Sequence, residues 1–395
     1  MPQNEAVLCH PRRTAVGRFG GSLKDMPATA LGATVVEEII RQTELDPGLV
    51  DGVVMGQVVT AGAGMNPARQ AALRGGLPTI VPALTVNRVC GSGAQAIATA
   101  AQEVWLGQAR CMIAGGMENM DQGPYLLARA RWGYRMGPGT LVDATLRDGL
   151  NDAFSGEHSG WHTEDLVASH DISREAQDAW AARSQQRFAK AQEAGHFKAE
   201  IVPVTVRDKS GETAFDTDEA NRPDATESGL AKLRSAFRKD GTITAGNAPG
   251  LNAAAAAMLV ATPAFAEEHG LEVAARLVAV GVGAVEPGMF GLGPVPAVQQ
   301  ALDRAGWRIG DIERAEVNEA FAAIAIALTR ELGLSEDVVN VEGGAIALGH
   351  PIGATGAILA TRLMHSMARD GLGRGLVTLC IGGGQGIALL LERPT

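Results

Sequence analysis

Two distant stretches of the chain carry the same order of predicted elements. Residues 49–57 and residues 311–319 each pass from the end of a helix into a strand. Farther along, Cys90 and His350 each precede a Gly-Ala pair, a helix, a strand and a Gly-Gly pair. This echo predicts two similar α/β units that face each other across a shared site. Chance regularity within a single α/β chain is the alternative explanation.

Along the rest of the chain, short apolar runs typical of strands alternate with helical patterns, as expected for an α/β protein. Strands are predicted at 52–59, 83–86, 110–114, 276–282, 315–317 and 376–380, and helices at 31–43, 94–107, 296–305, 320–331 and 354–368. Residues 120–247 are more polar and irregular, with one helix at 174–194 and a charged stretch at 207–240. We interpret 120–247 as an inserted loop domain. The N-terminal half is then 1–119, completed by 248–273, and the C-terminal half is 274–395.

Composition indicates a large soluble globular protein, since 395 residues with 46% hydrophobic content can bury a large core. The cysteines Cys9, Cys90, Cys111 and Cys380 form no C-x-x-C pair, so neither disulfides nor a metal site is expected and a reducing, cytoplasmic location fits. No signal core precedes Arg12, and the apolar run near 253–260 is too short to cross a bilayer. A net charge of −10 disfavours nucleic acid as a partner, so an anionic ligand needs a local basic patch.

Cys90 lies where a predicted strand turns through small residues into an Ala-rich helix. At the amino end of a helix, unpaired N–H groups and the helix dipole favour a thiolate. Gly91 and Gly93 leave room above the sulfur and can direct N–H groups toward an oxyanion. The pattern therefore indicates a nucleophile, and a small buried hydrophobic residue is the alternative.

Three further motifs lie in the second half of the chain. Asn318 follows a short strand, where its amide holds a water or carbonyl oxygen, or else caps the next helix. His350 stands alone in a run of small residues and is the side chain that accepts a thiol proton near neutral pH, although a lone histidine is often structural. Cys380 ends a strand beside Gly382, whose N–H can approach a ligand, and an inert buried cysteine is the alternative.

Together these motifs resemble those of the thiolases, in the acetyl-CoA acetyltransferase and β-ketothiolase branch. The similarity runs over almost the whole chain, through residues 13–23, 66–70, 115–120 and 380–384. The resemblance implies a five-layer αβαβα core built from two βαβαβαββ halves, with a loop domain that receives coenzyme A. It also implies a coenzyme A thioester as substrate, no prosthetic group, and a homodimer or homotetramer.

The resemblance assigns a role to each motif. Cys90 matches the nucleophile that accepts the acyl group, and His350 matches the residue that activates it. Cys380 matches the cysteine that moves the α-proton of acetyl-CoA. Asn318 matches the residue that holds a catalytic water, which with His350 forms an oxyanion hole for the enolate. The N–H groups of Cys90 and Gly382 match a second oxyanion hole.

The resemblance also implies the coenzyme A contacts. Arg222 matches a residue that packs on the adenine, and His158 matches a histidine near the pantetheine. The positions that match the pantetheine channel are Leu150, Ala248, Pro249, Leu251 and Phe321. Further basic candidates for the phosphates, with a solvated surface as the alternative, are Lys232, Arg234, Arg238 and Lys239.

Some positions depart from the family pattern. Pro249 stands where the family usually has Ser, and proline offers neither a hydroxyl nor an N–H to the coenzyme. Ser159 replaces a common Met beside the acyl pocket, and Ala253 replaces a usual Asp. Thr355 and Gln385 match only some branches, among them thiolases for longer acyl chains.

The sequence therefore predicts an acyltransferase of fatty-acid metabolism that condenses two acetyl-CoA or cleaves a 3-ketoacyl-CoA through an acyl-cysteine. The alternatives are a thiolase for longer acyl chains and a degenerate relative that binds acyl-CoA without turnover. A ketoacyl synthase is disfavoured because those enzymes lack a counterpart of Cys380.

Overall fold

The computed structural model describes residues 5–208 and 211–394. Its strands are β1 Val7–Thr14, β2 Gly17–Arg18, β3 Gly52–Gly56, β4 Ala83–Val86, β5 Cys111–Asn119, β6 Tyr125–Leu126, β7 Val142–Asp143, β8 Ile201–Val202, β9 Val204–Asp208, β10 Gly211–Phe215, β11 Asn252–Ala261, β12 Val273–Ala284, β13 Arg314–Val317, β14 Arg374–Ile381 and β15 Gln385–Glu392. Its α-helices are α1 Ala28–Thr43, α2 Pro67–Arg74, α3 Ser92–Trp105, α4 Ser159–Ser169, α5 Arg174–Glu193, α6 Glu227–Leu230, α7 Pro263–Glu268, α8 Pro294–Ala305, α9 Ala322–Leu332, α10 Ala345–Leu348 and α11 Thr355–Asp370.

The sheet confirms that the two halves of the chain repeat the same order of elements. In the N-terminal half the strand order is β4-β3-β5-β11-β1, with β3 parallel to β4 and to β5. In the C-terminal half it is β13-β14-β15-β12, with β13 parallel to β14. Antiparallel pairing of β1 with β12 joins the two halves into one hydrogen-bonded path. The segments that carry Cys90 and His350 thus hold equivalent places in two similar units.

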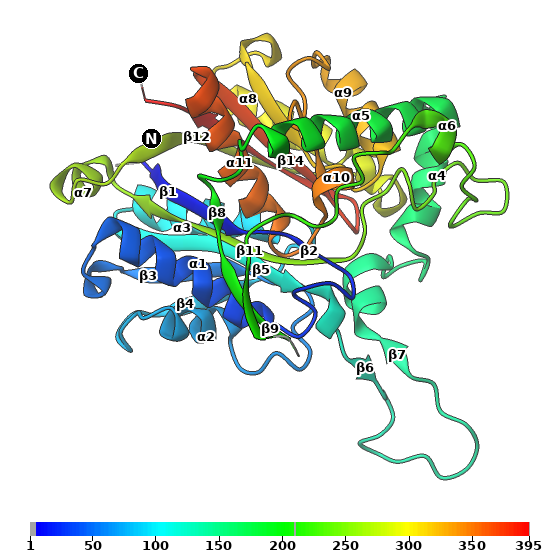
Figure 1. The fold of residues 1–395 in the computed structure, drawn as a ribbon, viewed down its shortest axis with the longest axis horizontal. Coiled ribbons are helices and arrows are strands. Elements are labelled where there is room, and N and C mark those ends of the chain that lie inside the picture. The colour runs from blue at the N-terminus through cyan, green and yellow to red at the C-terminus, as the bar shows by residue number, and fades with distance from the viewer. Residues whose placement is uncertain (1–4, 209–210, 395) are drawn as a thin grey trace.

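The elements form the five α/β layers that the resemblance implies (Figure 1). Helices α1 and α2 cover the outer face of the N-terminal half, and α8 and α9 cover the outer face of the C-terminal half. Helices α3 and α11 pack against each other between the two halves. Their amino ends meet in the middle of the molecule, which is where Cys90 and His350 lie.

The run of alanines in β11 is explained by the burial of this strand between two layers of helices. The apolar run near residue 253 is too short to span a membrane and instead forms β11, in which every residue is buried. Its two faces pack against α1 and α11, and small Ala side chains let both helices approach. Among the described residues, no helix has both the length and the apolar character needed to cross a membrane.

Helices α3 and α11 approach so closely that backbone meets backbone. A Cβ atom on Gly356 would lie 2.3 Å from the backbone N of Ala94, and one on Gly93 would lie 2.7 Å from the N of Ala357. Gly116 on β5 makes room in the same way, because its Cβ would lie 2.2 Å from the carbonyl O of Gly353. Glycine is thus required here for contact between the two halves.

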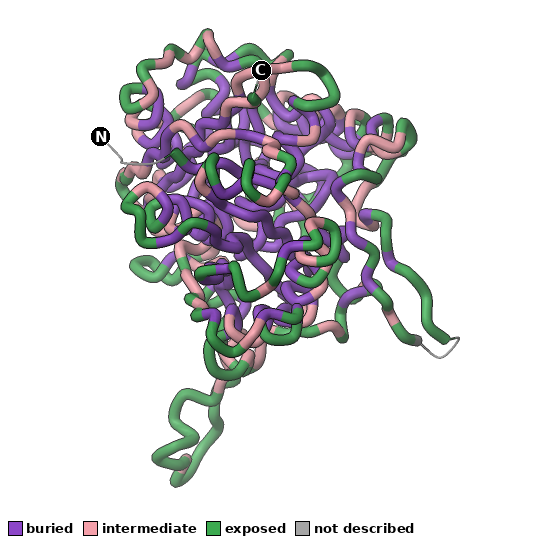
Figure 2. Tube along the Cα trace, turned by 90° about the vertical axis from the view of Figure 1, so that its left-hand side faces the viewer, coloured by how far each residue is buried: buried purple, intermediate pink, exposed green. Residues whose placement is uncertain are grey.

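Residues 120–247 connect β5 to β11 and contribute several elements around the core. Helix α5 packs on α9 and α10 of the C-terminal half, and α4 packs on α9. The segment between β6 and β7 extends away from the body as an exposed arm, drawn in green in Figure 2. Arg13 of β1 is fully buried and binds Glu200 at 2.7 Å and Asp218 at 2.7 Å, which ties this region to the N-terminal half.

The predicted elements recur with shifted ends. The helix expected at 320–331 begins only at Ala322, because Asn318 to Phe321 leave β13 as an irregular segment. The strand expected at 110–114 continues to Asn119, since its later residues are also buried and pair with β11. Strand β1 and helix α2 were not predicted.

We expect Gly356→Ala to destabilise the protein by about 1–3 kcal/mol or more, because the new methyl group collides with the backbone of α3. Gly310→Ala is the matched control, since a Cβ there meets no atom within 4 Å. Urea unfolding followed by circular dichroism measures both variants. Equal unfolding midpoints would show that the close approach is not needed.

Candidate active site

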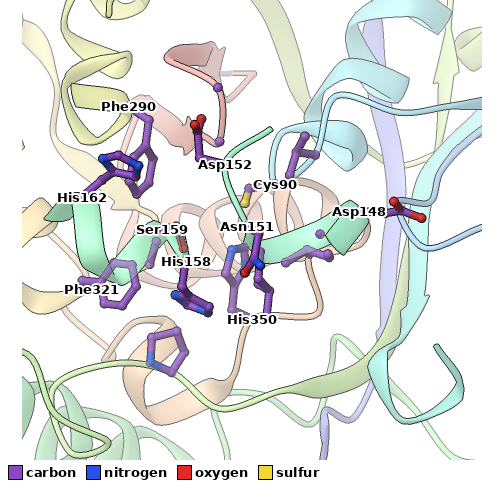
Figure 3. Close-up of a pocket in the computed structure, with 18 of the residues that line it drawn as sticks. Cys90, Asp148, Asn151, Asp152, His158, Ser159, His162, Phe290, Phe321 and His350 are labelled. Carbon is purple, nitrogen blue, oxygen red and sulfur yellow. The ribbon is translucent and has the colours of Figure 1, made fainter. Parts of the chain in front are cut away.

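A cavity of about 550 Å³ opens between the two halves and the inserted region. Cys90, His350 and Gly382 line it together with residues of the inserted segment (Figure 3). Their elements are far apart in sequence and meet only because α3 and α11 share one layer. Of the predicted catalytic residues, Cys90, His350 and Gly382 therefore meet at this cavity, whereas Asn318 and Cys380 are buried and are not among its lining residues.

Cys90 sits in a turn between β4 and α3. The residue before it, Val89, has a φ of +44°, which a β-branched side chain rarely adopts. Ser92 holds this turn, because its hydroxyl donates to the carbonyl of Val89 at 2.7 Å and accepts the N–H of Arg88 at 2.8 Å. Strain supported in this way is typical of functional sites, and no pattern in the sequence signals it.

The expected thiolate at Cys90 is not what the structure indicates for the resting protein. Burial raises the pKa of Cys90 to about 11, although N–H groups of Gly382 and Cys90 itself favour the thiolate. The charge of Glu118 raises the pKa further. Desolvation therefore outweighs the helix terminus, and Cys90 is a neutral thiol until a base takes its proton.

His350 is buried, and its hydrogen bonds define its tautomer. Nδ1 lies 2.7 Å from the hydroxyl of Thr355, and this hydroxyl donates to the carbonyl of Pro351 at 2.9 Å. Because a carbonyl only accepts, Nδ1 carries the hydrogen and Nε2 keeps its lone pair. Burial lowers the pKa of His350 to about 4, so the imidazole is neutral and able to accept a proton.

Asn318 faces His350 and does not cap a helix. Its Nδ2 lies 3.4 Å from Nε2 of His350, while α9 begins at Ala322 with Phe321 as its N-cap residue. The capping alternative is therefore wrong. The Oδ1 atom of Asn318 is buried and makes no hydrogen bond to another described residue, which leaves it available to a small polar ligand.

Cys380 lies at the end of β14 and is fully buried. Burial raises the pKa of its thiol far above the ordinary range, and the nearby Cys90 raises it further. The effect of Cys90 on the pKa of Cys380 indicates that the two sulfurs lie close to each other. Gly383 and Gly384 follow with φ values of +85° and +84°, so the chain turns sharply and brings Gly382 to the cavity.

The predicted pantetheine residues also line the cavity: Leu150, His158, Ala248, Pro249, Leu251 and Phe321. His158 caps α4 by accepting the N–H of Gly160 on Nδ1 at 3.0 Å, so in the neutral ring Nε2 carries the hydrogen. Burial lowers the pKa of His158 to about 4. Its ring stacks on Phe237 at 4.6 Å, and Phe237 meets Phe321 edge-on at 5.9 Å.

Not every predicted residue lies at the cavity. Arg222 is exposed and outside the lining, and its backbone N–H donates to Gln185 at 2.7 Å. Arg238 is engaged by Asp165 in a two-point ion pair. Ala253 is buried within β11, so its difference from the family pattern does not touch the cavity.

Two buried carboxylates support the site, and the sequence analysis missed their roles. Glu118 accepts the N–H groups of Val58 and Gly353, which joins the segment after β3 to the segment after His350. Glu319 accepts hydrogen bonds from the side chains of Trp180 and Ser184 on α5, from Asn340, and from the backbone of Ile346. In the sequence, the only indication of these roles is that Glu118 precedes Asn119 and Glu319 follows Asn318.

Within residues 5–208 and 211–394, no group of His, Cys, Asp and Glu side chains is placed to hold a metal ion. A partly accessible thiol facing backbone N–H donors, at a cavity that also presents a neutral imidazole with an unprotonated Nε2, is typical of enzymes that act through a cysteine nucleophile. The chain belongs to the thiolase family: "Thiolase, N-terminal domain" matches residues 6–264, and "Thiolase, C-terminal domain" matches residues 271–393.

Relatives of known sequence cover nearly the full chain. An acetyl-CoA acetyltransferase of Pseudomonas aeruginosa is 51% identical over 98% of this chain and 99% of its own length. An acetyl-CoA acetyltransferase of Chromobacterium violaceum is 50% identical over 99% of this chain and 100% of its own. The crystal structure of the Bacillus anthracis acetyl-CoA acetyltransferase superimposes with a TM-score of 0.97 at 40% identity, over 99% of both chains.

The pKa values of Cys90 and His350 predict how alkylation of the free protein depends on pH. Because the thiol titrates at about 11, its thiolate fraction increases about tenfold per pH unit between about pH 6 and 9. His350 stays neutral over this range, since its pKa is about 4. Mass spectrometry of the Cys90 peptide after timed iodoacetamide treatment measures the rate. A plateau over the lower half of the range would indicate an imidazolium–thiolate pair instead.

Thr355 is expected to hold the His350 tautomer. Thr355→Val keeps the shape but removes the acceptor for Nδ1–H, so the turnover number should fall at least about tenfold. Thr355→Ser retains a hydroxyl and should recover most of the rate. Steady-state kinetics of the two variants, with thermal unfolding as a check on folding, tests this role. Equal rates for Val and Ser would contradict it.

Proposed function

We propose that this chain is an acetyl-CoA C-acyltransferase. It condenses two acetyl-CoA into acetoacetyl-CoA, or cleaves a 3-ketoacyl-CoA with coenzyme A, in a ping-pong reaction through an acyl group on Cys90. The observation that carries the proposal is that Cys90 and His350 line one cavity, while the buried Cys380 lies close enough to Cys90 for Cys90 to raise its pKa. The names of the full-length relatives from Pseudomonas aeruginosa and Chromobacterium violaceum support the same activity.

In the first half-reaction, the sulfur of Cys90 attacks the thioester carbonyl of acetyl-CoA while Nε2 of His350 takes the thiol proton. The N–H groups of Cys90 and Gly382 point toward the sulfur and are suited to stabilise the oxyanion beside it. The C–S bond of the thioester then breaks. Cys380 protonates the leaving coenzyme thiolate, which leaves Cys90 acylated, His350 protonated and Cys380 as a thiolate.

In the second half-reaction, the Cys380 thiolate removes the α-proton of another acetyl-CoA. A thiol whose pKa lies far above its ordinary value is a strong base once ionised. Protonated Nε2 of His350, and a water held by Asn318, stabilise the enolate oxygen. The enolate carbon attacks the acyl carbonyl, and the departing Cys90 sulfur recovers its proton from His350.

We infer that residues 120–247 form the loop domain that receives coenzyme A. The pantetheine arm lies against Phe321 and the stacked rings of His158 and Phe237, and Nε2–H of His158 donates to one of its carbonyl oxygens. Arg222, which is exposed, packs on the adenine beyond the cavity. Pro249 removes one donor from this channel and weakens coenzyme binding. All proton transfers use side chains of the chain, so the coenzyme thioester is a substrate and no prosthetic group takes part.

A thiolase for longer acyl chains is the second candidate function, and the small side chain of Ser159 in the cavity wall favours it. A binding protein without turnover is disfavoured, because the catalytic residues are complete. Turnover of any 3-ketoacyl-CoA would exclude it.

We propose a homodimer or homotetramer in the cytoplasm, in fatty-acid metabolism. Strand β4 is an edge strand, and the large apolar side chains Ile80 and Leu84 on and beside it are 78% and 50% exposed. The arm between β6 and β7 exposes Trp132 and Met136 in the same way. A second copy of the chain would cover such surfaces, and the free cysteines suit a reducing compartment.

Replacing each of the two cysteines should impair a different step of the reaction. Cys90→Ser should form no acyl-enzyme with acetyl-CoA, whereas Cys380→Ser should still acquire an acetyl group on Cys90, though more slowly. Cys380→Ser should lose exchange of the acetyl-CoA α-protons with D₂O by about 10²-fold or more, because no base remains. Mass spectrometry and proton NMR measure the two steps, and Cys9→Ser is the control thiol outside the cavity. Normal condensation by Cys380→Ser would contradict the assignment.

A further inference from the structure

The cavity contains a chain of polar side chains that the condensation does not use. Asp152 and His162 line the cavity, and Ser155 lies between them. The Ser155 hydroxyl is 3.0 Å from Oδ1 of Asp152 and 2.7 Å from Nε2 of His162. The hydroxyl-bearing Ser159 lines the cavity one helical turn from His162, on the first turn of α4. The proposed reaction gives none of these residues a task.

The hydrogen bonds determine which atom His162 presents. A carboxylate only accepts, so the Ser155 hydroxyl donates to Asp152 and must accept from Nε2–H of His162. In the neutral ring Nδ1 therefore carries a lone pair. Within the described residues, no hydrogen bond engages Nδ1 of His162. His162 lines the cavity, and its Nδ1 is thus an acceptor without a donor among the described residues.

His162 of this polar chain packs against a different segment from His158, whose ring stacks on Phe237 in the proposed pantetheine channel. Nδ1 of His162 would be 3.3 Å from a Cβ on Gly288, in the segment Pro287–Leu292. The same segment packs on the turn after Cys380, since a Cβ on Gly384 would be 2.9 Å from Cα of Pro287. Figure 3 draws His162 with Phe290, and His158 with Phe321 below them. In the arrangement proposed below, the acyl group lies on the side with His162, next to the segment that packs on the turn after Cys380.

The charge behind His162 selects among polar acyl groups. Burial raises the pKa of Asp152, but hydrogen bonds from Ser155 and Phe154 bring it below its ordinary value. Asp152 is therefore an anion near neutral pH. It repels a terminal carboxylate, whereas a neutral hydroxyl can donate to Nδ1 of His162 and also pair with Ser159.

We propose that His162 and Ser159 select a 3-ketoacyl thioester whose acyl chain carries a hydroxyl group beyond the ketone, an inference that rests on the proposed thiolase function. The hydroxyl donates to Nδ1 of His162 and accepts from the hydroxyl of Ser159. An alkyl chain of the same length displaces water from both atoms without replacing its hydrogen bonds. The site thus discriminates by the polarity of the acyl end in addition to its length.

The test compares two substrates of equal size. In 5-hydroxy-3-oxopentanoyl-CoA a hydroxyl replaces the terminal methyl group of 3-oxohexanoyl-CoA, so chain length is matched. We expect the wild-type protein to cleave the hydroxylated thioester with a kcat/KM at least about fivefold higher, as one net hydrogen bond provides. His162→Phe retains a ring, and Ser159→Ala removes only an oxygen. Each should bring the ratio of the two kcat/KM values to about one or below.

Matched controls lie on the last turn and C-cap of the same helix, outside the cavity. Ser169→Ala and His170→Phe make the same chemical changes there and should leave the ratio at its wild-type value. Cleavage of acetoacetyl-CoA with a wild-type ratio of one or less would overturn the inference while leaving the proposed function intact. Absence of cleavage of any 3-ketoacyl-CoA, acetoacetyl-CoA included, would overturn the proposed function itself.

Discussion

The contact between the amino ends of α3 and α11 is the constraint on which the rest of the structure depends. A Cβ on Gly356 or Gly93 would fall within 2.7 Å of the backbone of the opposite helix, so only glycine allows this approach. It brings Cys90 and His350, which are equivalent positions in the two halves, to one cavity. Glu118 strengthens the junction by accepting N–H groups from both sides. Catalytic geometry is therefore a consequence of how two similar units pack.

Burial gives this site its chemistry as well as its shape. Desolvation raises the pKa values of both thiols and lowers that of His350, so each group is neutral at rest. Because Cys90 and His350 are both neutral, they form no ion pair in the free protein. In the proposed reaction, charge develops only after a thioester binds. In the proposed reaction, preorganised N–H groups and a water held by Asn318 meet that charge without reorganisation. Such a site relies on positioned donors more than on the intrinsic strength of its bases.

The sequence analysis identified the two-half organisation because hydrophobic periodicity and glycine pairs are local signals, readable at residues such as Cys90 and His350. It could not place Thr355 against Nδ1 of His350 or Asp152 near His162, since a hydrogen bond between side chains depends on backbone positions that the fold supplies. It also assigned Cys90 a thiolate from the helix terminus alone. The opposing cost of burial depends on every neighbour of the sulfur, and those neighbours come from distant segments.

The sequence by itself determined the family, the α/β architecture and the residue types available for acyl transfer, because these follow from motifs and periodicities within short segments. Only the tertiary structure decided which of those residues meet, the protonation state in which they rest, and which atoms face the cavity. It separated Arg222, which lies outside the cavity, from His158, which lines it. The physical reason is that desolvation and hydrogen-bond geometry are properties of packed neighbours, and packing joins residues that the linear chain keeps apart.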